Sequence, residues 1–175
     1  MLRIKQIKKN NYQSGFSLIE IIAVIFIIVI GLIGILSLVV QNIQIKNFNQ
    51  NTLIASQLAQ EGLELIRNTR DKNWLELNPF GSNLVSAGNS DTITIYFDGT
   101  DINISSVSDI NSESAELKKN NNFYIHGTGE ETIFKRVIEL DNSGLDFITA
   151  SSIVQWNSRN KIYNYEADTI LYDWR

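Results

Sequence analysis

Residues Ile21 to Val40 read IIAVIFIIVIGLIGILSLVV, a run without any charge in which Ser37 is the one polar side chain. An α-helix needs roughly 20 consecutive apolar residues to cross the hydrocarbon core of a bilayer. The stretch therefore predicts one transmembrane helix close to the N-terminus.

The charges on the two sides of this span differ. Four basic residues and no acidic one precede Gly15: Arg3, Lys5, Lys8 and Lys9. Because basic residues gather on the cytoplasmic side of a membrane helix, we expect the N-terminus in the cytoplasm and the rest of the chain outside the membrane.

The composition restricts the possible partners and chemistry. The whole chain has a net charge of −4, and removal of the residues up to Gly15 would change it to −8. An acidic protein has no general electrostatic attraction to nucleic acid, so nucleic acid is not an expected partner. The chain has no cysteine, which excludes disulfides, thiol nucleophiles and cysteine metal sites.

A possible processing site lies ahead of the span. Secretory signal peptides place a small-residue cleavage site after their apolar stretch, whereas here Ser14-Gly15 stands before Phe16 and before the stretch. Cleavage between Gly15 and Phe16 would remove the basic leader and leave the span attached to the chain.

The segment GFSLIE, residues 15–20, followed by an unbroken apolar helix, resembles the processing site of type IV pilins and type II secretion pseudopilins. The resemblance implies that prepilin peptidase cleaves after Gly15 and methylates the new N-terminus at Phe16. Glu20 would be the fifth residue of the mature chain, where this family carries its glutamate. The implied partners are the peptidase, other pilins or pseudopilins through the N-terminal helix, and the fibre assembly platform. No cofactor is implied.

Glu20 is also notable on physical grounds. An acid placed deeply in a membrane span costs about 2.5–3.5 kcal/mol, so its carboxylate needs a partner. In the family explanation this partner is the α-amine of Phe16 in the same or an adjacent subunit, which makes Glu20 an assembly residue. The competing interpretation is an ordinary signal-anchor in which Glu20 sits near the cytoplasmic headgroups.

Apolar and small residues continue at helical spacing after Val40. They are Ile45, Phe48, Thr52, Ala55, Leu58, Ala59, Gly62, Leu65 and Ile66. The spacing predicts that the membrane helix continues to about Thr69 and lays this stripe on a sheet. The predicted layout is a cytoplasmic leader (1–15), a transmembrane and assembly helix (16–40), its amphipathic continuation (41–70) and an extracytoplasmic globular domain (71–175).

Two further features bear on the type of subunit. Major type IV pilins usually carry a helix-bending proline where this chain has Ser37, which favours a minor pilin or pseudopilin. The segment QEGLELIRNTRDKNW, residues 60–74, resembles the helix end of the minor-pilin group that includes type IV pilus modification proteins and pseudopilin I. Asn68 to Pro79 is expected to end the helix, because Pro79 cannot continue it.

The remaining sequence predicts an antiparallel sheet. A strand over 92–97 is followed by an Asp98-Gly99 turn. Three more strands, about 132–140, 147–156 and 161–172, are separated by the short polar connections 141–144 and 157–160. Ser105 to Asn122, with Lys118, Lys119 and the asparagine run, is expected to be a surface loop. The predicted fold class is α+β and pilin-like, with a long N-terminal helix packed on a small C-terminal sheet.

Catalytic and metal sites are not expected. His126 is the sole histidine, and the glycine-containing segment around it predicts a turn or surface residue. One histidine without cysteine excludes the usual zinc and Cys–His sites, and no GxSxG element supports a serine nucleophile. Asp98, Asp101 and Asn103 could offer oxygen ligands to calcium, but their spacing is that of a hairpin turn rather than an EF-hand.

An aromatic cluster lies near the C-terminus. Its members are Trp156, Tyr163, Tyr165, Tyr172 and Trp174. Alternation along the strands predicts that they pack in the core and at the sheet edge. An exposed interface for a partner at the tip of a fibre is the weaker interpretation.

The leading hypothesis is a non-enzymatic minor pilin or pseudopilin, held in the cytoplasmic membrane and then built into an extracytoplasmic or cell-surface fibre. One alternative is a major pilin. Another is a signal-anchored extracytoplasmic enzyme or binding domain that never polymerises. A DNA-uptake pseudopilin gains no support from the acidic composition. Fold does not decide among adhesion, motility, secretion and DNA uptake.

Overall fold

The computed structural model describes residues 15–85, 90–142 and 146–173. The chain divides into two compact units, Met1–Ile45 and Lys46–Arg175. Part of the predicted connection at 143–144 and Trp174 lie outside the described residues.

The helix α1, Leu18–Leu75, begins in the first unit and continues into the second. Within the first unit, every large apolar side chain from Phe16 to Ile45 is exposed. A helix that is apolar on all sides is suited to lipid or to the interior of an assembly rather than to water.

The C-terminal end of α1 is closed by a hydrogen-bonded turn. The backbone N–H of Asn78 donates to the carbonyl oxygen of Asn73 at 2.8 Å, and Leu77 lies in the left-handed region with φ of 59°. This is the arrangement of a Schellman cap, in which glycine usually occupies the left-handed position. The end falls within the segment Asn68 to Pro79 that predicts it.

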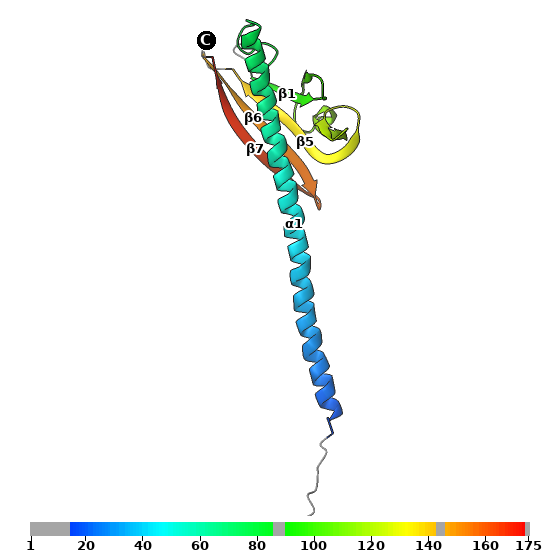
Figure 1. Cartoon of the computed structure of the whole chain (residues 1–175). Coiled ribbons are helices and arrows are strands. Elements are labelled where there is room, and N and C mark those ends of the chain that lie inside the picture. Colours follow the sequence, from blue (N-terminus) through cyan, green and yellow to red (C-terminus); the bar gives the residue numbers. More distant parts are fainter. Residues whose placement is uncertain (1–14, 86–89, 143–145, 174–175) are drawn as a thin grey trace, which may run out of the picture. The chain divides into compact units, whose positions relative to one another are not determined.

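The second unit contains a seven-stranded antiparallel sheet (Figure 1). Its strands are β1 (Ser90–Phe97), β2 (Ile102–Ser106), β3 (Glu116–Asn120), β4 (Phe123–Ile125), β5 (Glu130–Asp141), β6 (Phe147–Ser158) and β7 (Lys161–Tyr172). A short 3-10 helix, Glu113–Ala115, precedes β3. Together α1 and this sheet confirm the predicted α+β fold class.

The strand β5 organises the sheet. It pairs with β3 from Glu130 to Lys135 and with β1 from Ile138 to Asp141. It also pairs with β6, and β6 pairs with β7. The last three strands therefore form the antiparallel meander that the sequence predicts.

The expectation of a surface loop from Ser105 to Asn122 is wrong, because β3 lies within it. Lys118 is opposite Ile125 of β4 and also opposite Glu131 of β5. The strand gives little sequence signal, since Leu117 is its one buried side chain. Its pairing with two neighbouring strands, rather than an apolar alternation, decides its conformation.

Two hydrophobic clusters form the core of the second unit. One contains Leu63, Ile66 and Ile138 among others, and the other contains Leu58, Phe134 and Trp156 among others. The buried residues of α1 are Ala55, Leu58, Ala59, Gly62, Leu63, Ile66, Thr69 and Asn73. The core therefore covers the helix only from Ala55 onward.

The predicted helical stripe is wrong at its start. Ile45 is 56% exposed and Phe48 is 40% exposed, while Thr52 and Leu65 are half-buried. Phe48 still contacts the rim of the core, because its ring lies 5.1 Å from that of Tyr163. Helical spacing identifies the face that turns inward, but not where the sheet begins to cover it.

Gly62 sits where the helix approaches the sheet most tightly. A Cβ atom at this position would lie 2.8 Å from Cδ1 of Ile138 and 2.9 Å from Oγ of Ser152. Real Cβ atoms do not tolerate such distances. The absence of a side chain at Gly62 therefore leaves room for the side chains of Ile138 and Ser152 against the helix.

A buried cation lies in the same region. Arg136 of β5 is fully buried, and its Nη1 donates to the carbonyl oxygen of Leu58 at 2.8 Å while its Nη2 donates to that of Ile95 at 2.6 Å. Glu61 supplies a carboxylate oxygen 3.6 Å from Nη1. Burial lowers the pKa of Arg136, and Glu61 opposes that shift. Because a buried charge is costly unless it is paired, this set of contacts ties α1 to β5 and β1.

Candidate functional site

The predicted processing residues stand at the start of α1. Gly15, Phe16 and Ser17 precede the helix, which begins at Leu18. The carbonyl oxygen of Ser17 accepts the first helical bonds, from the backbone N–H of Glu20 at 3.0 Å and of Ile21 at 3.2 Å. Serine is favoured immediately before a helix. The sequence thus begins a helix directly after the proposed cleavage point.

Glu20 lies in the first turn of α1, where the helix dipole favours a negative charge. Its side chain is exposed, and Phe16 beside it is 79% exposed. Among the described residues, Glu20 forms no salt bridge. In the uncleaved chain Phe16 has no free α-amine, so the pairing proposed for Glu20 requires prior cleavage after Gly15.

Gly15 is not required by the fold of the described chain. A Cβ atom built at this position meets nothing within 4 Å, and its φ lies outside the left-handed range that favours glycine. By contrast, Gly62 is needed for packing. A glycine without a packing role at the proposed cleavage junction is compatible with recognition by an enzyme.

The apolar part of α1 is long and apolar enough to cross a membrane. Gly31 and Gly34 within it have open space around them, because a Cβ at either position meets nothing within 4 Å. Near the end of the apolar run, Ser37 accepts a weak hydrogen bond from Gln41 Nε2 at 3.5 Å. The helix therefore offers an apolar surface, with small residues at which another helix can approach closely.

The prediction that His126 is a turn or surface residue is confirmed for its place in the chain, because it lies in the bend between β4 and β5, but it is wrong about exposure. His126 is 7% exposed, its Nδ1 lies 3.2 Å from the carbonyl oxygen of Glu116, and its ring meets that of Tyr96 edge-on. Burial, followed by the charge of Arg136, lowers its pKa to about 4. His126 is buried because neighbouring strands enclose it. The glycine-containing segment around His126 gives no signal of this burial.

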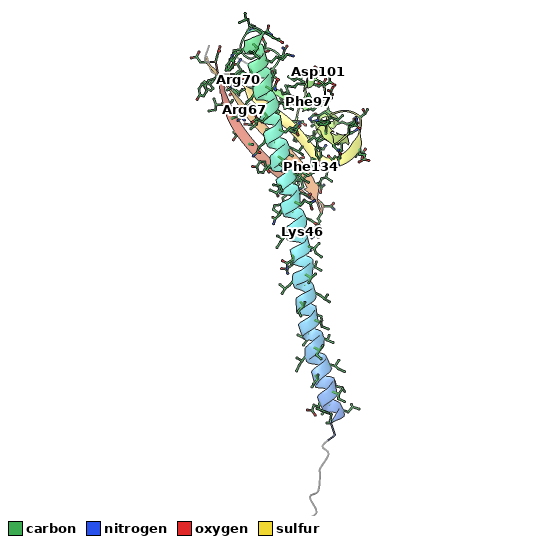
Figure 2. The ribbon with its side chains drawn as sticks, viewed as in Figure 1. Lys46, Arg67, Arg70, Phe97, Asp101 and Phe134 are labelled. Atoms are coloured by element: carbon green, nitrogen blue, oxygen red, sulfur yellow. The ribbon has the colours of Figure 1, made fainter. Side chains whose placement is uncertain are left out.

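The turn after β1 is a hairpin, as predicted from its spacing. One carboxylate oxygen of Asp98 accepts from the backbone N–H groups of Thr100 and Asp101, at 2.8 and 2.9 Å, and the other accepts from Asn103 Nδ2 at 2.9 Å. These bonds, that from Asp101 first, lower the pKa of Asp98. Phe97 and Asp101 mark the hairpin in Figure 2. In the described parts of the chain, no group of acidic and histidine side chains could hold a metal ion.

The C-terminal aromatic residues divide between core and surface. Trp156 is 2% exposed and stacks on Tyr163 at 5.6 Å between ring centroids, and Tyr165 packs against the same cluster. Tyr172 is 55% exposed and pairs with Phe147. Core and edge packing is confirmed for these residues, while Trp174 lies outside the described chain.

Comparison with known proteins gives one match. Residues 10–36 match the family described as the prokaryotic N-terminal methylation motif, so the match includes Gly15, Phe16, Glu20 and the first part of α1. No curated protein and no solved structure matches the chain. The motif and the apolar helix within it indicate a membrane-anchored, single-pass protein. The N-terminal segment of this chain is a type IV pilin-like prepilin signal.

Proposed function

We propose that this protein is a structural subunit of a type IV pilus-like or type II secretion fibre. The observation that carries the proposal is the methylation motif at residues 10–36, which runs into a helix whose large apolar side chains are all exposed up to Ile45. Such a surface needs lipid before assembly and other helices afterwards. A subunit that moves from membrane to fibre meets both needs.

The proposed mechanism is assembly rather than catalysis. Prepilin peptidase cleaves after Gly15, the new α-amine of Phe16 is methylated, and the carboxylate of Glu20 pairs with that amine in the same or a neighbouring subunit. The exposure of Glu20 and its lack of a salt bridge within the described chain support this role. The N-terminus faces the cytoplasm before cleavage, and Lys46–Arg175 lies outside the membrane.

Within this class, a minor pilin or pseudopilin fits better than a major pilin. Ser37 occupies the position at which major pilins usually carry a proline, and α1 continues through it. A minor subunit needs few copies per fibre, whereas a major subunit makes up its length. Quantitative mass spectrometry of sheared fibres distinguishes the two by copy number.

The test of the main proposal is N-terminal mass spectrometry of the protein from membranes and from sheared fibres, with and without prepilin peptidase. We expect a methylated Phe16 that depends on the peptidase. A Gly15→Ala variant should retain the leader, whereas Gly31→Ala, also a glycine with open surroundings, should be processed normally. An intact Met1 in fibres, or cleavage beyond Val40, would overturn the proposal in favour of an anchored or secreted domain.

A further inference from the structure

The strand β7 has one unpaired edge over its full length. It pairs with β6 from Ser158 opposite Lys161 to Phe147 opposite Tyr172, with no shift of register. Among the described residues, no strand pairs with its other edge. Figure 1 shows β7 at the border of the sheet, beyond β6.

The ladder identifies the backbone groups that face outward. The N–H of Asp173 donates to the carbonyl oxygen of Asp146 at 2.8 Å, so this pair is of the hydrogen-bonded type. Such pairs alternate along an antiparallel ladder, and the odd-numbered residues of β7 therefore bond to β6. The outward N–H and C=O groups belong to the even-numbered residues Ile162, Asn164, Glu166, Asp168, Ile170 and Tyr172.

The side chains of the same residues leave the edge accessible. Even-numbered side chains of β7 are exposed, while those at odd positions from Tyr163 onward are half-buried or buried. Arg67 of α1, labelled in Figure 2, donates from Nη2 to Thr169 Oγ1 at 3.0 Å. The helix thus contacts the face that carries the odd-numbered side chains.

Long open edges are usually protected by proline, bulges or charge. β7 contains no proline and its ladder has no bulge. Among its even-numbered residues, whose side chains are exposed, two are charged: the acids Glu166 and Asp168 in the centre of the strand. Ile170, 50% exposed, follows them, while Asn164 and then Ile162, 62% exposed, precede them. The even-numbered positions therefore form a pattern in which two acids lie between an apolar residue on one side and a polar and an apolar residue on the other.

We propose that the free edge of β7 receives an extended strand from another protein, which adds to the sheet by backbone hydrogen bonds. Its side chains opposite Glu166 and Asp168 are basic, and those opposite the flanking isoleucines are apolar. Opposite charges in cross-strand pairs stabilise a sheet, and like charges facing each other destabilise it.

A second copy of β7 does not fit this edge. The antiparallel registers with the greatest overlap place Glu166 opposite Glu166 of the copy, or opposite its Asp168. A parallel pairing in register also brings acids next to acids. The partner strand therefore has a sequence different from that of β7. This inference is independent of the fibre proposal, because it concerns binding by the isolated protein.

The test uses the full chain in detergent micelles and a synthetic peptide with threonine at every second position. The positions between these threonines are, in order, valine, valine, lysine, lysine, threonine and valine. In an antiparallel pairing they lie opposite the even-numbered residues of β7 from Tyr172 to Ile162, so the two lysines face Asp168 and Glu166. Residue-resolved hydrogen exchange should show rapid exchange at the even-numbered amides of β7 in the free protein. Added peptide should slow these amides and leave the odd-numbered ones unchanged.

The charge pattern is tested by reversing the charge of the peptide and, separately, that of β7. A peptide with glutamate in place of lysine should bind about tenfold more weakly. The double variant Glu166→Lys, Asp168→Lys should reverse this preference, whereas Asp109→Lys, Glu113→Lys, which changes two exposed acids elsewhere, should not.

The backbone contribution is tested at Asn164. Asn164→Pro removes one outward N–H group and should weaken lysine-peptide binding, while Asn164→Ala keeps that group and should not. Protection of the even-numbered amides without peptide would overturn the proposal. Equal binding of both peptides, or binding of neither, would also overturn it. The exchange measurement on the unmodified protein decides the matter even if Asn164→Pro fails to fold.

Discussion

Arg136 Nη1 donates a hydrogen bond to the carbonyl oxygen of Leu58 at 2.8 Å, and this bond joins β5 to the C-terminal half of α1. The same guanidinium bonds to Ile95 of β1. One buried side chain therefore connects the helix with two strands. Within Lys46–Arg175, this contact holds the helix on the sheet together with apolar packing.

Arg136→Ala should lower the free energy of unfolding by about 2–4 kcal/mol, because it leaves the carbonyl groups of Leu58 and Ile95 without their donor and opens a cavity in the core. Arg136→Met, which retains most of the volume, should cost less. Chemical denaturation of the full chain in detergent measures both. Lys135→Ala, which removes a partly exposed pair with Glu116, should cost no more than about 1 kcal/mol. Equal effects at 135 and 136 would contradict the role of Arg136.

In Gly62→Ala the new methyl group collides with Ile138 and Ser152, which should cost about 1–3 kcal/mol in packing. Alanine by itself favours a helix by about 1 kcal/mol over glycine, so the net destabilisation should be up to about 2 kcal/mol. Gly34→Ala is the matched control, since its surroundings are open, and it should not destabilise the chain. A stabilising Gly62→Ala in the same denaturation assay would contradict the close approach.

Stability should fall with acid between about pH 6.5 and pH 4 because of His126. Its pKa is lowered to about 4 in the folded protein, so the unfolded chain takes up the proton first as the pH falls. The loss should reach about 3 kcal/mol and then level off. His126→Gln should flatten the profile in this window. Asp98 acts at lower pH. Its pKa in the folded protein lies below the ordinary aspartate value of 3.8, so the stability that its charged form provides is lost only as the pH falls below that value.

Leu77→Gly should stabilise the protein by about 1 kcal/mol. Leu77 occupies a left-handed conformation at the end of α1 and is 82% exposed, so glycine relieves backbone strain and removes little packing. Leu75→Gly is the contrasting variant, because Leu75 is 87% exposed but helical and glycine there should cost about 0.5–1 kcal/mol. Thermal melting compares the two, and shifts of the same sign would contradict the cap.

Glu20→Gln should leave cleavage intact and prevent assembly. The change removes the charge that we propose to pair with the α-amine of Phe16, and loss of one partner from a buried pair costs about 3–5 kcal/mol. Mass spectrometry should still find Phe16 at the N-terminus in membranes, while sheared fibres should lose the protein. The control is Glu76→Gln, which changes an exposed acid just after the end of α1 and should assemble normally. Normal fibre incorporation of Glu20→Gln would favour a simple headgroup position for this residue.

The features predictable from the sequence are those that a local pattern encodes. An unbroken apolar run identifies the N-terminal helix, and alternation with polar connections identifies β5, β6 and β7. The methylation motif matched at residues 10–36 is also a short contiguous segment. Each of these signals lies within a few neighbouring residues.

The features that escaped prediction depend on residues far apart in the chain. β3 is a strand because β5 pairs with it, and His126 is buried because other strands enclose it. In the segment IFKRVIEL, residues 133–140, Arg136 looks like an ordinary surface charge. It nevertheless occupies the same alternate positions as the buried residues Phe134, Ile138 and Leu140, and so lies on the inward face of the strand. A single charge at an inward position of a strand is the signal that could have identified it.

The contact between Leu58 and Arg136 also bears on when the protein can fold. It spans 78 positions, and the strands that cover α1 are the last to be synthesised. Until β5, β6 and β7 are complete, the inward face of the helix lacks most of the residues that it packs against, because β1 and β3 supply only Ile93, Ile95 and Leu117 to the two core clusters. We therefore expect the membrane helix to form early and the second unit to close late, in one step that waits for the C-terminus. Chains truncated before residue 130 would remain anchored, unfolded and open to proteolysis.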